Sequence, residues 1–420
     1  MKKYIYLCII VLLAGQIACS DEFLSNSSTE RQASGEPATE GAILSNLAAT
    51  YQILLFDSYA DNNYNSIVLT SDLRSDDIFK GGADAGDQHQ LYLLSLFTTS
   101  PEENIGGLWN IYFSGIARAN NVIDACENAV GFNTAADVKK LERYKAEAYF
   151  LRAYYTHWLW KFWGNIPYFE SPLTEAPYMA RQYKADEIYA EIMEDLDFVL
   201  DKDKDRLPMV TPEADLGRVN RAAAIMLKAR TVLYQKDRER YGEVTKELAE
   251  IIDSEAYSLF DDFAGIWVDA NEFNCESIFE VNHLPEGKTW SSGWQGYGTN
   301  LPAFISPSNL KAGANAGDFK GGWGFCPVRS DIWDIYEEDD TRREGSINQW
   351  ETDQYAARFQ DTGFFLAKYA AREGYNPQGD ADLNYCNNLR LFRYAETLLT
   401  YAELLIMHGQ SPVNGITAQA

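Results

Sequence analysis

The sequence predicts a mostly α-helical protein in which paired helices form a scaffold and a long irregular segment is inserted between them. Three observations lead to this prediction. Apolar residues recur at three- and four-residue steps in several segments of 41–255 and again at 389–408, which is the spacing of amphipathic helices. Small residues fill the seam of one predicted helix pair. Residues 256–387 are rich in Gly, Trp and Asn and show little helical periodicity.

The first predicted helix covers about residues 41–57 and has one continuous apolar face. Residues 61–107 are less periodic and contain the polar run TSDLRSDDIFKGG at 70–82. A second helix is predicted at about 108–129, where the apolar spacing returns.

The next helix is the longest and the most aromatic. Thr134 and Asp137 form a predicted capping box at its start, and Gly164 with Pro167 is expected to end the helix. A helix that is apolar nearly all round must be covered on several sides, so we place it in the middle of the helix stack. Four tryptophans on predicted helices are therefore expected to pack in the core: Trp109, Trp158, Trp160 and Trp163. For the same reason His157 is expected to be a hydrogen-bonded packing residue and not a ligand.

The remaining helices are predicted at about 183–200, 215–236, 240–254 and 389–408. Several alanines in 215–236 are small enough to let this helix approach its neighbour closely. Helix pairs of this size with small residues at the seams are typical of tetratricopeptide-type repeats, although the WxxLGxxY consensus is absent.

The N-terminus predicts export. Two lysines precede an apolar run at 4–14 that is too short for a membrane anchor but suits a signal peptide. Ala18-Cys19 resembles the end of a bacterial lipoprotein signal, which implies cleavage after residue 18 and lipidation of Cys19. Residues 19–40 then form a polar leash, and the acidic Ser-Asp-Glu after the cysteine resembles a tag for surface export. The alternative is an ordinary secretory signal with an incidental cysteine.

Composition limits the function classes. The formal net charge of −26 disfavours nucleic acid and anionic membrane surfaces as partners. A hydrophobic content of 46% excludes bulk disorder, and we expect residues 41–420 to form one domain. The four cysteines of this domain form no CxxC or close pair, so no disulfide framework is predicted: Cys126, Cys275, Cys326 and Cys386.

Four features in register resemble the SusD/RagB family, the nutrient-binding surface lipoproteins of Bacteroidetes. They are the lipoprotein start, the block AEAYFLRAYY with FWGNIPY at 146–168, LGRVNRAAAIMLKARTVLY at 216–234, and LRLFRYAETLLTYAELL at 389–405. The resemblance implies a scaffold of tetratricopeptide-like helix pairs at about 41–255 and 389–408, and a loop-rich ligand-binding region at about 256–387. It also implies an oligosaccharide or, less often, a peptide as ligand, and a TonB-dependent outer-membrane transporter as partner.

The sequence departs from the family at its end. Family members usually continue past the block at 389–405 into another helix and a tail, so this chain is expected to lack the family's C-terminal end. The helix at 389–408 would then expose an apolar patch.

No catalytic constellation is recognisable. HExxH, GxSxG, GxGxxG and phosphate-binding loops are absent, so the protein is not expected to be an enzyme or to hold a cofactor. Asp201, Asp203 and Asp205 have the first spacings of a calcium loop, but Arg206 replaces the required Gly and Pro212 the bidentate Glu, so no metal site is predicted.

Aromatic residues in flexible loops are the candidates for ligand binding. Sugar rings present apolar faces that stack on indole and phenol rings, while carboxylates and Arg take the hydroxyls. Four aromatic residues lie among Gly and Ser in the predicted loop region: Trp290, Trp294, Tyr297 and Trp323. The resemblance implies a site built from both an early loop and this later one, so polar partners are expected at Asp72, Arg74, Asp76 and Asp77. The alternative for each ring is a minor core beneath the loops.

Three function classes therefore remain. The first is a non-catalytic lipoprotein that binds a glycan, or a peptide, and passes it to a transporter. The second is a helical-repeat scaffold for envelope assembly, which would not need ring-bearing loops. The third is a secreted glycoside hydrolase, which would turn over its substrate.

Overall fold

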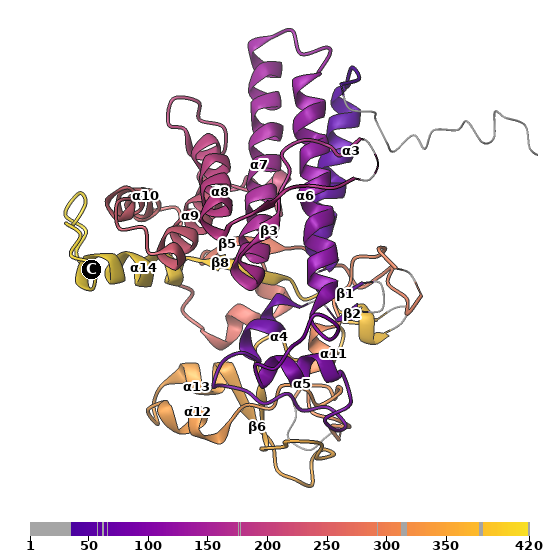
Figure 1. The fold of residues 1–420 in the computed structure, drawn as a ribbon. Helices are drawn as coiled ribbons and strands as arrows, with labels where there is room; N and C mark the ends of the chain where they lie inside the picture. The colour runs from indigo at the N-terminus through magenta and orange to yellow at the C-terminus, as the bar shows by residue number, and fades with distance from the viewer. Residues whose placement is uncertain are drawn as a thin grey trace, which may run out of the picture.

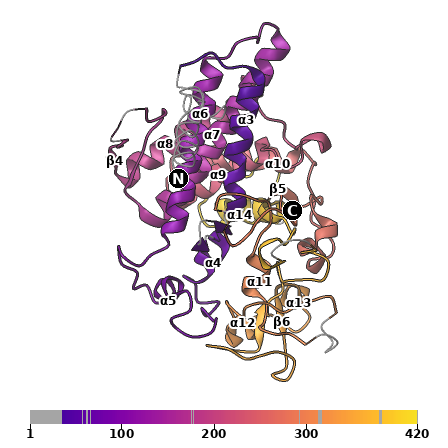
Figure 2. The ribbon, with the colours of Figure 1, turned by 90° about the vertical axis from the view of Figure 1, so that its right-hand side faces the viewer.

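The computed structural model describes residues 35–56, 58–60, 63–64, 66–174, 176, 178–291, 293–311, 317–377 and 381–418. The predicted signal peptide at 1–18 and Cys19 lie outside these residues, as does most of the leash. The described chain has two layers, with long helices above a lobe of short elements (Figure 1). The turned view shows the same order, with α11–α13 and β6 beneath the helices (Figure 2).

Three long helices lie side by side and form one side of the scaffold, with α6 and α7 antiparallel: α3 (Glu40–Tyr51), α6 (Gly106–Glu127) and α7 (Ala135–Trp163). The 3-10 helix η2 (Gln52–Phe56) continues α3. Gly115 of α6 lies against the ring of Tyr155 of α7, and a Cβ at Gly115 would come within 2.4 Å of that ring. A side chain at this position would therefore push the two helices apart.

The long aromatic helix has the predicted ends and the predicted environment. Thr134 and Asp137 form the capping box, and Gly164 ends α7 with a φ of +69°. Trp160 is buried, and the three other helical tryptophans are partly buried and pack against the same core. His157 is buried, and its Nδ1 lies 2.9 Å from the Thr231 hydroxyl. These residues confirm that α7 lies in the middle of the stack.

A buried ion pair joins α7 to α8 (Ala185–Leu200). Arg152 Nε donates to Asp195 Oδ2 at 2.9 Å, and the side chains of these two residues are 6% and 2% exposed. Arg152 also donates to Asn120 Oδ1 of α6 at 2.8 Å. This guanidinium therefore ties three helices together.

The scaffold continues through α8, α9 (Arg221–Gln235), α10 (Tyr241–Asp253) and α14 (Tyr394–Ile406), each packing on the one before it. The prediction of a helix from residue 389 is wrong for its first turn. Residues Leu389–Arg393 form strand β8, which pairs antiparallel with β5 (Ser277–Val281). The hydrogen bonds that β5 offers override a local apolar spacing that also suits a helix.

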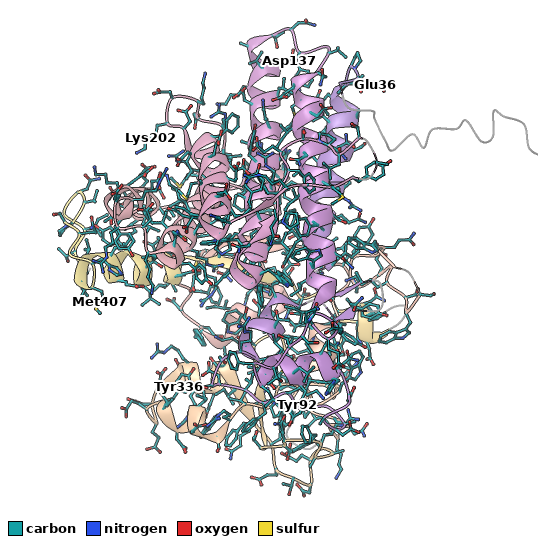
Figure 3. The ribbon with its side chains drawn as sticks, in the orientation of Figure 1. Glu36, Tyr92, Asp137, Lys202, Tyr336 and Met407 are labelled. Carbon is teal, nitrogen blue, oxygen red and sulfur yellow. The ribbon has the colours of Figure 1, made fainter. Side chains whose placement is uncertain are left out.

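The apolar stripe of the helix predicted at 389–408 is not exposed as expected, because Leu391, Tyr394, Leu398, Tyr401 and Leu405 are buried or half-buried, and the side chains that this region exposes are others. In α14, Tyr401 and Leu404 are buried, whereas Leu399, Ile406 and Met407 are exposed. Met407 lies at the outer end of the scaffold (Figure 3).

The lower lobe joins the irregular segment to an earlier part of the chain. Its short helices are α4 (Ile67–Asp72), α5 (His89–Ser95), α11 (Leu301–Ile305), α12 (Ser330–Ile335) and α13 (Thr341–Ser346). The remaining strands form the antiparallel pairs β1 (Tyr59–Ala60) with β2 (Asn63–Tyr64), β3 (Ile166–Pro167) with β4 (Gln182–Tyr183), and β6 (Ile347–Gln349) with β7 (Phe364–Leu366). Further 3-10 turns are η3 (Glu213–Asp215), η4 (Ala264–Trp267), η5 (Asp269–Asn271) and η6 (Ala381–Leu383).

Two general features of the described residues bear on the predictions. None of their helices has the length and apolar character needed to cross a membrane. The cysteines at 126, 275, 326 and 386 are all free thiols, in agreement with the absence of a predicted disulfide framework.

Candidate functional site

Aromatic side chains from three distant segments meet on the loop lobe. The ring centroids of Trp290 and Trp323 are 5.8 Å apart, with 31° between their planes. Tyr59 lies 5.4 Å from Trp290, and Tyr64 lies 5.7 Å from Trp323. The structure thus brings together two of the four predicted loop aromatics and adds two tyrosines from an earlier segment.

The two tyrosines come from the short hairpin β1–β2. The strand register sets Tyr59 directly opposite Tyr64, so their rings lie on one face, 5.3 Å apart. Tyr59 is buried and supports the site, while Trp290 is 43% exposed and available to a ligand.

A small open hollow of about 210 Å³ lies over these rings. Its wall combines five aromatic side chains with three polar or charged ones, and it consists of Tyr64, Asp87, Gln88, Trp290, Phe304, Trp323, Phe325 and Arg358. We call this the ring hollow.

Trp323 is held in place from both ends. Its indole Nε1 donates to Asp382 Oδ2 at 3.0 Å, and its backbone carbonyl accepts a hydrogen bond from Arg358 at 2.6 Å. The Phe304 ring packs edge-on against it at 5.9 Å. A ring that is fixed before a ligand arrives loses little conformational entropy on binding.

The ring hollow suits a neutral, hydroxyl-rich ligand with an apolar face. Aromatic faces can stack on sugar rings, and polar groups at the rim can bond the hydroxyls. The pKa of Tyr64 is raised to about 12, mainly by burial of its side chain and to a smaller extent by the neighbouring Tyr59, Asp87 and Asp382. The Tyr64 phenol therefore keeps its proton at neutral pH and can both donate and accept a hydrogen bond.

The other two predicted aromatics lie elsewhere. Trp294 is partly buried and packs edge-on against Phe56 at 5.6 Å, so it follows the alternative in which a loop ring belongs to a minor core beneath the loops. Tyr297 is exposed, but it borders a separate groove of about 730 Å³ between α3 and the turn at 216–218. Neither residue lines the ring hollow.

None of the predicted early-loop residues lines the ring hollow either. Burial, and then the Asp77 carboxylate, raises the pKa of Asp72 to about 6. The carboxylate of Asp331 is the main cause that raises the pKa of Arg329, and Asp76 and Asp77 add to it. Asp76 and Asp77 therefore interact with the loop of Arg329. The guanidinium of Arg74 lies over the rings of Phe97 and Phe162.

Several residues of the hollow were not singled out from the sequence. Tyr59 and Tyr64 stand among Asn, Asp and Ser, which is the same signal that marked the later aromatics, and it could have identified them. Arg358 and Asp382 carry no comparable local signal. Their roles depend on loops that meet only in the folded chain.

The aspartates at 201, 203 and 205 do not converge in a calcium loop. Asp205 pairs with Lys139 at 3.3 Å, and Asp201 lies 3.5 Å from Arg206. Among the described residues, no group of three or more His, Cys, Asp or Glu side chains is arranged to hold a metal ion.

Two family models match the chain. The model described as "Starch-binding associating with outer membrane" matches residues 22–233, and the "SusD family" model matches residues 279–418. A SusD-like protein of Bacteroides ovatus is 23% identical over 95% of this chain and 71% of its own length.

Solved structures of surface glycan-binding proteins are similar over most of the chain. Surface glycan-binding protein A of Bacteroides fluxus is 61% identical, with a TM-score of 0.86 over 91% of this chain and 80% of that one. The corresponding protein of Bacteroides thetaiotaomicron, in complex with laminarihexaose, is 36% identical, with a TM-score of 0.83 over 89% and 80%. A laminarin-binding SusD-like protein is 26% identical, with a TM-score of 0.78 over 90% and 82%.

Proposed function

Because the chain belongs to the SusD family, we propose that it is a non-catalytic lipoprotein of the cell surface that binds a glycan and passes it to a TonB-dependent outer-membrane transporter. The observation that supports glycan binding is the ring hollow. Trp290 is exposed there beside Trp323, which hydrogen bonds already hold in place.

We further propose a glucan of the laminarihexaose type as the ligand. Laminarihexaose is a neutral hexasaccharide of β-1,3-linked glucose, and the relative solved with it is 36% identical to this chain over 89% of its length. The hollow supports this choice because its rings can stack on pyranose faces while Asp87 and Arg358 lie at the rim for hydroxyl groups. A neutral sugar is also not repelled by a chain with a formal charge of −26.

Calorimetric titration with laminarihexaose tests this proposal. We expect saturable binding of laminarihexaose and much weaker binding of cellohexaose and maltohexaose, which have the same length and a different linkage. A glycan and peptide array run alongside would reveal a peptide ligand. Saturable peptide binding with no response to any glycan would overturn the proposal.

The same mixture tests whether the protein is only a binder. After prolonged incubation, chromatography of laminarihexaose is expected to show the intact hexasaccharide alone. Shorter oligosaccharides that increase with protein concentration would instead indicate a hydrolase.

Replacing Cys19 by Ala is expected to release the protein from membranes. The lipid would be attached to this thiol, and the described residues offer no helix that could replace the anchor. Fractionation of cells carrying wild-type or Cys19→Ala protein measures the effect. A variant that still sediments with outer membranes after a high-salt wash would refute the lipid anchor.

A further inference from the structure

Residues 382–385 form a short segment that contacts both of the loops bearing the tryptophans of the ring hollow. It reaches the first loop through Asn384, whose Oδ1 accepts a hydrogen bond from the backbone N–H of Lys288 at 3.0 Å. The Asn384 Nδ2 donates to the carbonyl of the same residue at 2.8 Å. One buried amide side chain thus satisfies both backbone groups of Lys288, as a neighbouring strand would do. Trp290 follows two residues later in the sequence.

The backbone of the segment also meets the other end of this loop. Tyr385 and Thr299 exchange two backbone hydrogen bonds of 3.0 Å each. At Gly298, a Cβ would lie only 2.4 Å from the Cα of Asn384, so the approach requires glycine. The loop that bears Trp290 is therefore anchored to the segment near both of its ends.

The second tryptophan is held by its ring. Asp382 Oδ2 accepts the indole N–H of Trp323 at 3.0 Å. The Trp323 ring also packs against a small buried cluster that includes the side chain of Tyr385. The same short segment therefore holds Trp290 through its loop and Trp323 through its indole.

A common support for the two loops bears on how well the site binds. The Trp290 and Trp323 rings lie 5.8 Å apart with 31° between their planes, although they come from separate loops. Residues 287–298 include four glycines, and a glycine-rich backbone has a large conformational entropy unless other groups hold it. A loop that is fixed before the ligand arrives loses less of this entropy on binding. The contacts of the segment should therefore raise the affinity for a ligand of the ring hollow.

The polar side chains of the segment lie behind the rings. Among the described residues that line the ring hollow, neither Asp382 nor Asn384 is included. Both polar atoms of the Asn384 side chain are directed at Lys288, and Asp382 Oδ2 is directed at the Trp323 indole. An effect of these two residues on a ligand would therefore pass through the tryptophans.

We propose that Asp382 and Asn384 are positioning residues for glycan binding, which hold Trp323 and Trp290 as a preformed pair. This inference rests on the proposed function, because it takes its ligand from there. It adds two residues that determine the affinity from outside the contact surface.

A double-mutant cycle tests the role of Asp382. Asp382→Ala should lower the affinity for laminarihexaose about five- to tenfold, because the indole loses the hydrogen bond that orients it. Asp382→Asn retains an acceptor oxygen and should remain within about twofold of the wild type. In a Trp323→Phe background, whose ring has no N–H group, Asp382→Ala should cause no further loss. Calorimetric titration of the full chain measures each affinity.

The matched control is Asp237→Ala. Asp237 also accepts a hydrogen bond from an aromatic side chain, the Tyr189 hydroxyl at 2.8 Å, but it lies on the scaffold between α9 and α10. This variant should bind laminarihexaose as the wild type does. Unchanged affinity in Asp382→Ala, or an equal loss in Asp237→Ala, would overturn the positioning role. A loss that persisted in the Trp323→Phe background would show that Asp382 acts on the sugar directly, and would also overturn it.

Hydrogen exchange of the wild-type protein, followed by NMR, tests both residues without a substitution. The Lys288 amide and the Trp323 indole N–H should exchange slowly in the free protein, because each is donated to the segment, and laminarihexaose should slow them little further. Protection that arose only with laminarihexaose would mean that the ligand orders the rings, and would overturn the inference. A wild-type protein that bound no laminarihexaose in the calorimeter would instead overturn the proposed function, and this inference with it.

Discussion

Replacing both Trp290 and Trp323 by Ala is expected to reduce the affinity for laminarihexaose by at least about thirtyfold. Each ring contributes through buried apolar area, at about 1–3 kcal/mol per ring, so the loss of both corresponds to a free energy of binding of about 2 kcal/mol or more. The two rings lie 5.8 Å apart over one hollow, so a single sugar chain can contact both. Calorimetric titration measures the affinity.

Trp290→Ala alone should leave the fold unchanged because Trp290 is substantially exposed, whereas Trp323→Ala should also lower the melting temperature, since that ring packs against Phe304 and donates to Asp382. Trp294→Ala provides the matched control, since that ring packs against Phe56 outside the hollow. It should lower the melting temperature and leave the affinity unchanged. If Trp290→Ala/Trp323→Ala kept full affinity, the glycan site would have to lie elsewhere, and the groove beside Tyr297 would be the next candidate.

The largest effect on stability is expected from Asp195→Ala. The carboxylate of Asp195 is buried and neutralises Arg152, so its removal leaves a buried guanidinium without its charge partner. Breaking a buried ion pair from one side costs about 3–5 kcal/mol, against a total stability of about 5–15 kcal/mol for a typical domain. Thermal unfolding should show a clear loss of melting temperature, with any laminarihexaose binding retained below it.

Glu194→Ala is the appropriate comparison for this variant. Glu194 precedes Asp195 on α8 and is exposed, so its removal should change the free energy of unfolding by less than about 0.5 kcal/mol. Equal melting temperatures for the two variants would show that the ion pair between α7 and α8 contributes no net stability.

Most of the scaffold could be predicted from the sequence because its helices are long and strongly periodic. The signals at the two ends of α7 were sufficient to place it, since Thr134 with Asp137 and Gly164 act locally. The small side chains of α9 also had their expected effect, as its Ala222, Ala223 and Ala224 are all buried.

Strand β8 shows where local reasoning fails. Leu391 and Tyr394 continue the apolar spacing of α14 toward the N-terminus, so periodicity alone extends the helix too far. The strand conformation of Leu389–Arg393 is stabilised by pairing with β5, which lies more than a hundred residues earlier in the sequence. A partner so distant in the chain leaves no mark in a local pattern.

The candidate site could be predicted only in part for the same reason. Composition identified Trp290 and Trp323 as loop aromatics, but it identified Trp294 equally well, and that ring packs against Phe56. Whether a loop ring faces solvent depends on which other loops lie beneath it. The tyrosines of the β1–β2 hairpin carry the same local signal and could have been singled out, but their contact with the later loops is set only by the fold.

The division of the ring hollow among separate segments has a consequence for how such proteins diversify. The hairpin with Tyr64 and the loops with Trp290 and Trp323 come from different parts of the chain, whereas α6 and α7 meet directly through Gly115 and Tyr155. Each can exchange residues without disturbing the helices. A lineage could therefore change the sugar that it captures one loop at a time, while selection preserves the frame on which the loops are mounted.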